Sequence, residues 1–208
     1  KRPFHKAITC ASGDGLFFGP AEWPDAECEV AMRALAIETK RLGRIYKPRK
    51  HNKDESQTRV ALSEVSLTVP RGQLFAVLGP NAAGKTTTIK VLTGLIKPTS
   101  GTACVAGFDV QTQPLEARKL MAYVPDFPFL YDKLSPWEFL RFTGQLFGMD
   151  DARIRTTGEE LIARFNLEAY ANKPIEGLSH GTKQRVAIVS ALLHDPQVFV
   201  IDEPMVGL

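Results

Sequence analysis

Long hydrophobic runs are absent from this sequence of 208 residues. Its uninterrupted apolar stretches, such as Val198–Ile201, fall far short of the roughly 18 residues that a membrane-spanning helix requires, so we expect that the chain does not itself cross a bilayer. Cysteine is scarce: Cys10, Cys28 and Cys104 lack the spacing of a metal site or a redox motif. We therefore expect a reducing compartment and no disulfide framework.

Internal repeats and low-complexity tracts are also absent, and residues 1–35 contain no apolar signal-peptide core. Hydrophobic residues at 44% and charged residues at 24% are ordinary globular proportions, which argues against a fully disordered, collagen-like or coiled-coil chain. The length suits one compact domain. Residues 1–35 remain an unassigned N-terminal segment.

Positive charge is concentrated in one stretch. The net charge is +3, and residues 40–53 hold seven Lys or Arg side chains with no carboxylate among them. Such a run can contact nucleic acid or anionic lipid. A solvated loop is the simpler interpretation, because the charges are not interleaved with aromatic residues as in single-strand binders. We therefore do not expect nucleic acid as a partner.

From residue 60 onward the hydrophobic pattern predicts alternating strands and helices. The partly alternating run 60–69 predicts a strand, and the continuous apolar run 74–78 predicts a second strand that is covered on both faces. A helix should follow from Lys85 to about Leu95. The remaining predictions are strands near 103–105 and 121–124, helices around 161–167 and 186–193, and a fully buried strand at 198–201.

A further helix is predicted after Ser135. Pro136 follows this serine directly and Glu138 stands three positions after it, which is the spacing of a helix cap with a reciprocal carboxylate. The helix presents a wide apolar face for which core packing is the favoured role and a partner groove the alternative. That face comprises Trp137, Leu140, Phe142 and Phe147.

The segment between strand 74–78 and the helix at Lys85 has the spacing of a phosphate-binding loop: glycine, four residues, glycine, lysine, threonine. Small residues let successive backbone N–H groups turn toward phosphate oxygens, and the N-terminus of the following helix adds a positive field. Lys85 should reach the β- and γ-phosphates, and the Thr86 hydroxyl should ligate Mg²⁺. An ordinary glycine turn with an exposed lysine is the alternative. The expected nucleotide-binding residues are Gly79, Pro80, Asn81, Ala82, Ala83, Gly84, Lys85, Thr86 and Thr87.

Two acids, Asp202 and Glu203, follow the apolar run 198–201. The carboxyl ends of strands are where open α/β sheets place their ligands. We expect Asp202 to hold Mg²⁺ through its water shell and Glu203 to orient the attacking water beside the γ-phosphate. Without the phosphate loop upstream, this pair would equally well be a plain strand end.

A third motif spans 178–185 and reads Leu-Ser-His-Gly-Thr-Lys-Gln-Arg. Ser179 can cap a helix whose positive end points at an anion. The segment resembles the LSGGQ signature of ABC-type ATPases, with His180 and Thr182 in place of the usual glycine and glutamine. In that family the signature closes on the γ-phosphate of nucleotide held by the other subunit. The resemblance therefore implies that Ser179, His180 and Gly181 contact the ATP of a second ABC ATPase subunit.

The resemblance covers residues 36–208 and implies an α/β fold of the ABC type: a P-loop NTPase with a mixed sheet core and a helical subdomain at about 127–180. The segments 70–73 and 97–101, on either side of the phosphate loop, are similar to the drug-export branch that includes daunorubicin-resistance ATPases. In the family, a D-loop aspartate, a further strand and a switch histidine follow the position of Leu208. We therefore expect the domain to be incomplete after its Walker B motif.

The resemblance also assigns single residues. Tyr46 ends a segment that resembles the family's first strand and would stack on adenine; a surface or interior tyrosine is the alternative. Asp126 stands at the position of the Q-loop glutamine and is one methylene shorter, so it would contact Mg²⁺ or the attacking water weakly or through a water molecule. Ala82 replaces a family glycine, a minor change if its backbone can keep the same dihedral angle.

Together these features predict the ATP-binding and ATP-hydrolysing subunit of an ABC transporter. Its cofactors would be ATP and Mg²⁺, and its catalytic residues Glu203, Lys85 and Asp126. Its partners would be a second ATPase subunit and a membrane-spanning permease. It would lie at the cytoplasmic face of the membrane and drive export through the permease. The aromatic segment 127–137 is the expected docking surface, which requires that Phe129 and Tyr131 are exposed.

Two other functions stay open at this stage. One is a soluble ABC-type ATPase that acts on the ribosome or on nucleic acid, although such proteins usually carry paired ATPase domains or a long coiled coil, which this sequence lacks. The other is a fragment that binds nucleotide without turning it over.

Overall fold

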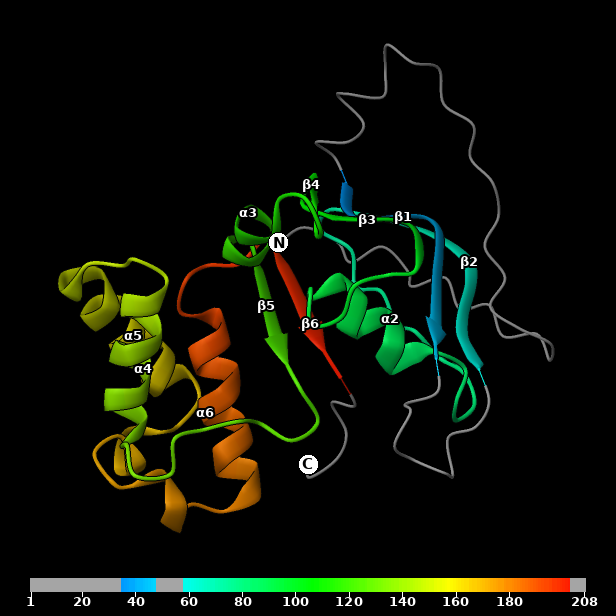
Figure 1. Cartoon of the computed structure of the whole chain (residues 1–208). Coiled ribbons are helices and arrows are strands. Elements are labelled where there is room, and N and C mark those ends of the chain that lie inside the picture. Colours follow the sequence, from blue (N-terminus) through cyan, green and yellow to red (C-terminus); the bar gives the residue numbers. More distant parts are fainter. Residues whose placement is uncertain (1–34, 48–57, 203–208) are drawn as a thin grey trace. The chain divides into compact units, whose positions relative to one another are not determined.

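The computed structural model describes residues 35–47 and 58–202 (Figure 1). The chain divides into two compact units, Lys1–Arg118 and Lys119–Leu208. Among the described residues, no helix combines the length and apolar character needed to span a membrane.

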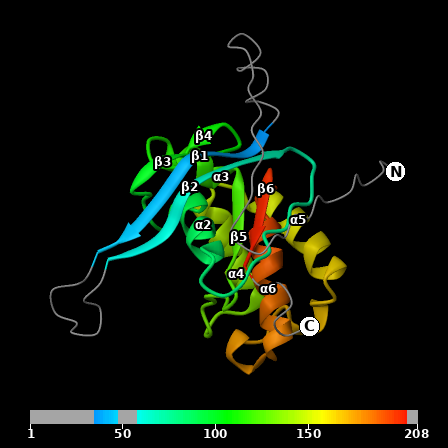
Figure 2. The same ribbon diagram turned by 90° about the vertical axis from the view of Figure 1, so that its right-hand side faces the viewer.

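An antiparallel sheet forms the first unit. Its strands are β1 (Leu35–Tyr46), β2 (Arg59–Pro70), β3 (Ser100–Val105) and β4 (Phe108–Asp109), in the spatial order β2-β1-β3-β4. The long strands β1 and β2 run side by side in both views (Figures 1 and 2). Helix α2 (Lys85–Leu92) packs on β2 and β3, and the short helix α3 (Pro114–Lys119) follows β4. The predicted strand at 60–69 and the one near 103–105 are confirmed as β2 and β3.

Strand β1 is irregular near its middle. Its register shifts between Thr39 and Leu42 against β2 and between Lys40 and Gly43 against β3, and Arg41 has a φ of +45°. A Cβ at Gly101 of β3 would collide with the carbonyl oxygens of Lys40 and Arg41. The bulge therefore needs a glycine in the neighbouring strand.

The predicted buried strand at 74–78 is wrong. Residues 73–80 form no strand, and the side chains of Leu74 and Leu78 are 78% and 63% exposed. A continuous apolar run becomes a buried strand only when neighbouring strands satisfy its backbone and helices cover both faces. Within the described part of the chain no strand pairs with this segment, so its side chains stay open.

Helix α2 starts at Lys85 as predicted but ends earlier than expected. Its last residue is Leu92, Thr93 is the C-cap, and Gly94 takes a φ of +68°. A left-handed glycine just after a helix is a common stop signal. Leu95, which was expected on the helix, is consequently exposed.

The second unit combines a short parallel sheet with helices. Strands β5 (Met121–Val124) and β6 (Val198–Ile201) pair in parallel, and both are at their predicted positions. Helices α4 (Pro136–Leu146), α5 (Asp151–Arg164) and α6 (His180–Leu192) surround one apolar core; two 3-10 turns, η1 (Glu168–Tyr170) and η2 (Ile175–Gly177), lie between α5 and α6. The expectation that β6 is fully buried is wrong, because only Val198 is buried and Phe199 is 38% exposed. A sheet of two strands leaves part of its faces uncovered.

Helix α4 begins with the predicted cap. The Ser135 hydroxyl accepts a bond from the Glu138 backbone N–H, and the Glu138 carboxylate accepts one from the Ser135 N–H at 2.8 Å. The buried face comprises Pro136, Phe139, Leu140 and Gly144, with Trp137 half-buried. The core role predicted for Phe142 and Phe147 is wrong, because both are exposed. Phe142 is two positions from Leu140 and so lies on the opposite side of the helix, and Phe147 follows the last helical residue as the C-cap of α4.

Candidate nucleotide-binding site

The phosphate loop lies in the first unit, directly before α2. The Lys85 ammonium donates hydrogen bonds to the carbonyl oxygens of Gly79 and Pro80, at 2.7 and 2.9 Å, and the Ala83 N–H donates to Pro80 at 3.2 Å. Gly84 is the N-cap of α2 and offers no side chain to the first-turn N–H groups. Those donors and the positive end of the helix are therefore available to an anion.

Two residues of the loop have a left-handed backbone conformation. Gly84 has a φ of +92°, and a Cβ there would lie 2.7 Å from the Ala61 carbonyl oxygen and 2.7 Å from Leu62 Cδ2. Ala82 has a φ of +67°, so alanine does take the left-handed conformation at the family's glycine position. That conformation costs a residue with a Cβ about 1–2 kcal/mol.

Access to the loop is open. The side chains of Asn81, Ala82 and Thr86 are exposed, and those of Lys85 and Thr87 are half-buried. A ligand can therefore reach the Thr86 hydroxyl and the Lys85 ammonium without movement of the core.

Two carboxylates gather at the carboxyl edge of the parallel pair in the second unit. Val124 and Ile201 are paired, Asp202 follows Ile201, and the Asp202 N–H donates to the Val124 carbonyl at 3.0 Å. Asp126 follows β5 by two residues, and its Oδ1 is buried without a hydrogen-bond partner. Glu203 lies outside the described residues. The structure therefore places Asp126 and Asp202 near the carboxyl ends of two adjacent strands, a proximity that follows from the parallel pairing of β5 with β6.

Tyr123 is a site residue that the sequence analysis did not single out. Its pKa is raised by burial and, to a smaller extent, by the negative charges of Asp202 and Asp126. The phenol therefore stays protonated beside these acids. Its place near the carboxyl end of a parallel strand was the signal that could have identified it.

The donor set suits Mg²⁺. Among the described residues no group of three or more His, Cys, Asp or Glu side chains could hold a metal. Proteins commonly bind Mg²⁺ through only one or two carboxylates, with waters and phosphate oxygens completing the octahedron. The orphaned Oδ1 of Asp126 and the carboxylate of Asp202 are ligands of this kind.

The signature segment forms the start of α6. Ser179 is the N-cap, and its hydroxyl accepts a bond from the Thr182 N–H at 3.3 Å and lies 2.9 Å from the Thr182 hydroxyl. Ser179 and His180 are exposed, whereas Thr182 is buried. The serine and the residue after it are thus presented outward, and the threonine at the family's glutamine position serves the helix itself.

Tyr46 is the last residue of β1, as expected from the sequence. Its ring is partly exposed, and the Arg44 guanidinium lies 4.7 Å from the ring centroid, a cation–π contact. Arg44 covers one face of the ring, which leaves at most the other face for a base.

The expected docking segment satisfies its condition. Phe129 and Tyr131 are 91% and 58% exposed, and Phe127 is 68% exposed. Tyr131 packs edge-on against Phe142 at 5.3 Å between ring centroids. The aromatic side chains therefore form an open surface in the second unit.

Residues 62–206 match the protein family described as ABC transporter. The chain is 36% identical over 156 residues to the ABC transporter ATP-binding protein NatA of Bacillus subtilis, covering 74% of this chain and 63% of that protein. It is 38% identical over 149 residues to the Nod factor export ATP-binding protein I of Cupriavidus metallidurans, covering 72% of this chain and 49% of that protein. The chain therefore spans between about half and two thirds of these relatives.

A solved structure, described as the ATP-binding subunit of an ABC transporter, superposes with a TM-score of 0.71 at 33% identity and covers 83% of this chain and 68% of that one. A second, cbiO1 from Clostridium perfringens, described as part of the ABC transporter complex cbiONQ, gives a TM-score of 0.68 at 26% identity.

Proposed function

The chain belongs to the family of ABC transporter ATP-binding proteins and has their P-loop fold, and from this premise we propose that it binds and hydrolyses ATP as the ATPase subunit of an ABC exporter. The observation that carries the proposal is the phosphate loop itself. The Lys85 ammonium lies over a loop that ends at the uncapped N-terminus of α2. This is an arrangement for binding a polyphosphate.

On nucleotide binding, backbone N–H groups of the phosphate loop and of the first turn of α2 would face the phosphates. The Lys85 ammonium would turn from the carbonyl oxygens of Gly79 and Pro80 to the β- and γ-phosphates, or would divide its hydrogen bonds between the two. The Thr86 hydroxyl would ligate Mg²⁺ and Asp202 would hold it through its water shell; when bound, the ion would neutralise charge on the phosphates. Tyr46 offers its free ring face to adenine.

For hydrolysis, Glu203 orients the attacking water, and Asp126 contacts that water or Mg²⁺ in place of the family's glutamine. The buried, unpartnered Oδ1 of Asp126 supports this role, because a buried acceptor without a partner gains most from a new donor or a cation.

Partners follow from the exposed segments. Ser179, His180 and Gly181 would contact ATP held by a second ATPase subunit, since the first two are exposed at the start of α6. A membrane-spanning permease would dock on the aromatic segment, which would place the chain at the cytoplasmic face of the membrane. Of the two relatives quoted above, one is named as an ABC transporter ATP-binding protein and the other as an export ATP-binding protein.

We assign residues 36–208 to the ATP-binding domain, with a helical subdomain at about 127–180 that contains α4 and α5. Most of the unassigned segment 1–35 lies outside the described residues. A nucleic-acid function gains no support from the described part of the basic run, because Lys40 pairs with Glu38 and Arg41 with Glu64.

The test compares ATP binding and hydrolysis of the full chain. We expect Mg²⁺-dependent turnover in the wild type, loss of turnover with retained binding in Glu203→Gln, and at least tenfold weaker ATP binding in Lys85→Ala. Wild-type turnover no faster than that of Glu203→Gln would support a binding protein without hydrolysis. Unchanged ATP affinity in Lys85→Ala would contradict the site itself.

A further inference from the structure

The segment between β5 and α4 is attached at several points to the turn η2 and to the start of α6. We call residues 127–134 the aromatic loop. The Glu176 N–H donates to the Asp132 carbonyl at 2.9 Å, and the Ile175 N–H donates to the Leu134 carbonyl at 2.9 Å. The loop is therefore joined by backbone hydrogen bonds to the 3-10 turn that precedes the signature.

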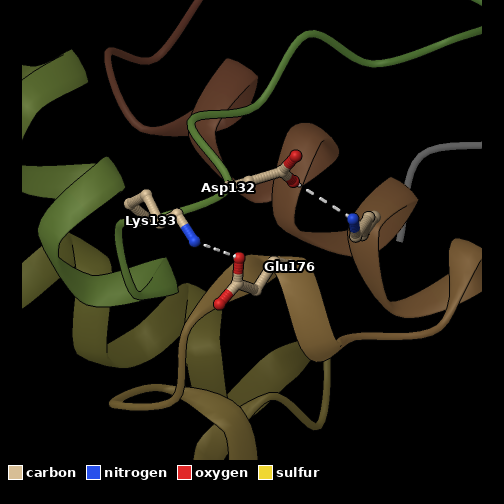
Figure 3. Close-up of polar contacts among 4 residues, drawn as sticks. Asp132, Lys133 and Glu176 are labelled. Carbon is tan, nitrogen blue, oxygen red and sulfur yellow. Dashed lines mark hydrogen bonds and ion pairs between the residues drawn. The ribbon is translucent and has the colours of Figure 1, made fainter.

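Two ion pairs add to this attachment (Figure 3). The Lys133 ammonium lies 2.6 Å from the Glu176 carboxylate, and the Lys183 ammonium lies 3.1 Å from the Asp132 carboxylate. Both side chains of the first pair are exposed to solvent, so this pair contributes little to the stability of the attachment. In the second pair the Lys183 side chain is only 27% exposed, so its charge is less screened and its partner matters more.

Lys183 belongs to the same helical turn as the signature serine. Its backbone N–H donates to the Ser179 carbonyl at 2.9 Å, the first hydrogen bond of α6, while its side chain reaches Asp132. A displacement of the Asp132 carboxylate is therefore passed to the turn that carries the Ser179 hydroxyl.

The opposite side of this turn is held separately. Arg185 donates to the Thr182 hydroxyl at 3.2 Å and to the Phe165 carbonyl at 3.1 Å, and Thr182 in turn contacts the Ser179 hydroxyl. This bracing ties the turn to the end of α5. The Asp132–Lys183 pair is the corresponding brace on the side of the aromatic loop.

We propose that the Asp132–Lys183 ion pair positions the Ser179 hydroxyl, so that breaking the pair weakens the ATP-dependent association of two chains without weakening ATP binding at the phosphate loop. Lys183 and Asp132 are thus positioning residues that act through the first turn of α6. The inference rests on the proposed function, in which Ser179 contacts the nucleotide of a second subunit.

The experiment uses the full chain in a Glu203→Gln background, in which ATP is bound but not consumed. Asp132→Asn and Lys183→Met each remove one charge, and the double exchange Asp132→Lys with Lys183→Asp restores a pair of opposite sign. Arg141→Met is the matched control, because the exposed Arg141–Asp151 pair at 3.3 Å lies in the same unit but off the signature turn. Dimerisation is measured by sedimentation with and without ATP, and ATP affinity by calorimetry at concentrations where the chain is monomeric.

We expect each single variant to weaken ATP-dependent dimerisation about three- to fivefold, which is the range that one partly screened pair supplies. The double exchange should restore ATP-dependent dimerisation to within twofold of that of the parent chain. ATP affinity should stay unchanged in every variant, and the Arg141→Met control should dimerise like the parent chain. Undiminished dimerisation in both single variants, or an equal loss in the control, would overturn the inference. A loss of ATP affinity or of melting temperature that matches the loss of dimerisation would assign the pair a merely structural role.

A second readout does not depend on dimerisation. In the monomer, Asp132→Asn should speed hydrogen exchange of the first-turn amides of α6 at 182–183 several-fold and leave those at 189–192 unchanged. If the parent chain does not dimerise with ATP but this exchange effect is seen, the dimer in the proposed function fails while the brace between loop and turn stands. Unaltered exchange overturns the brace, whatever the oligomeric state.

Discussion

Replacing Gly84 with alanine tests whether the phosphate loop depends on a residue without a Cβ at the start of α2. Gly84 combines a φ of +92° with close contacts, since an added Cβ would lie 2.7 Å from the Ala61 carbonyl oxygen. Gly72 offers a matched control in the same unit. Its φ is +73°, but no atom lies within 4 Å of an added Cβ.

The two substitutions separate a conformational cost from a steric one. A left-handed backbone costs a residue with a Cβ about 1–2 kcal/mol, so Gly72→Ala should lower the free energy of unfolding by about that amount. Gly84→Ala carries the same cost and an overpacking cost of about 1–3 kcal/mol, because a backbone carbonyl cannot rotate away as a side chain could. Its expected loss is therefore about 2–5 kcal/mol.

The assay is denaturant-induced unfolding followed by circular dichroism, together with the ATP dissociation constant from calorimetry. The collision at Gly84 can be relieved only by moving the loop away from β2. We therefore expect ATP affinity to fall at least about tenfold, which corresponds to about 1.4 kcal/mol, while Gly72→Ala leaves it unchanged. Equal stability losses in the two variants, or unchanged ATP affinity in Gly84→Ala, would refute the steric argument.

Three further predictions concern single side chains. Ala82→Gly should raise the free energy of unfolding by up to about 1 kcal/mol in thermal melts, because it relieves a φ of +67°; a loss would show that alanine is unstrained there. Ser135→Ala should lower the unfolding free energy by about 1 kcal/mol in urea titrations, because the capping bonds to Glu138 disappear, whereas Ser135→Thr should keep most of it. Burial lowers the pKa of His194, so the stability that its neutral ring contributes is complete above the ordinary pKa of about 6.5 and is lost as the pH falls below it. His194→Gln should flatten the melting temperature between pH 7 and pH 5, and an unchanged slope would rule this group out as the cause.

Local signals in the sequence indicate several elements but not all of their boundaries, since the helix expected around 161–167 is α5, which spans Asp151–Arg164. The Ser135 cap correctly places the start of α4, and the short apolar runs at 121–124 and 198–201 correctly give β5 and β6. Spacing alone also predicted the phosphate loop and the two acids, Asp202 and Glu203, after strand 198–201. These features depend on neighbouring residues, whose preferences can be read directly from the chain.

Features that depend on distant partners were not predictable. The apolar run 74–78 has the composition of a buried strand, but composition does not show whether partner strands are present beside it. The Asp132–Lys183 contact joins residues 51 positions apart, and charged surface residues carry no pattern that specifies such a pair. The exposure of Phe142 was missed for a related reason, because hydrophobicity was read without the register of the helix.

The parallel pairing of β5 with β6 has a consequence for the order in which the second unit is assembled. Met121 pairs with Val198, so β5 has no partner strand during synthesis until the residues of helices α4, α5 and α6 have been synthesised. Those helices start at their own caps, Ser135, Asp150 and Ser179, and can form from local contacts. Closing the sheet is the non-local and slower step. The strand ends that carry Asp126 and Asp202 are therefore brought together last, on a helical framework that already exists.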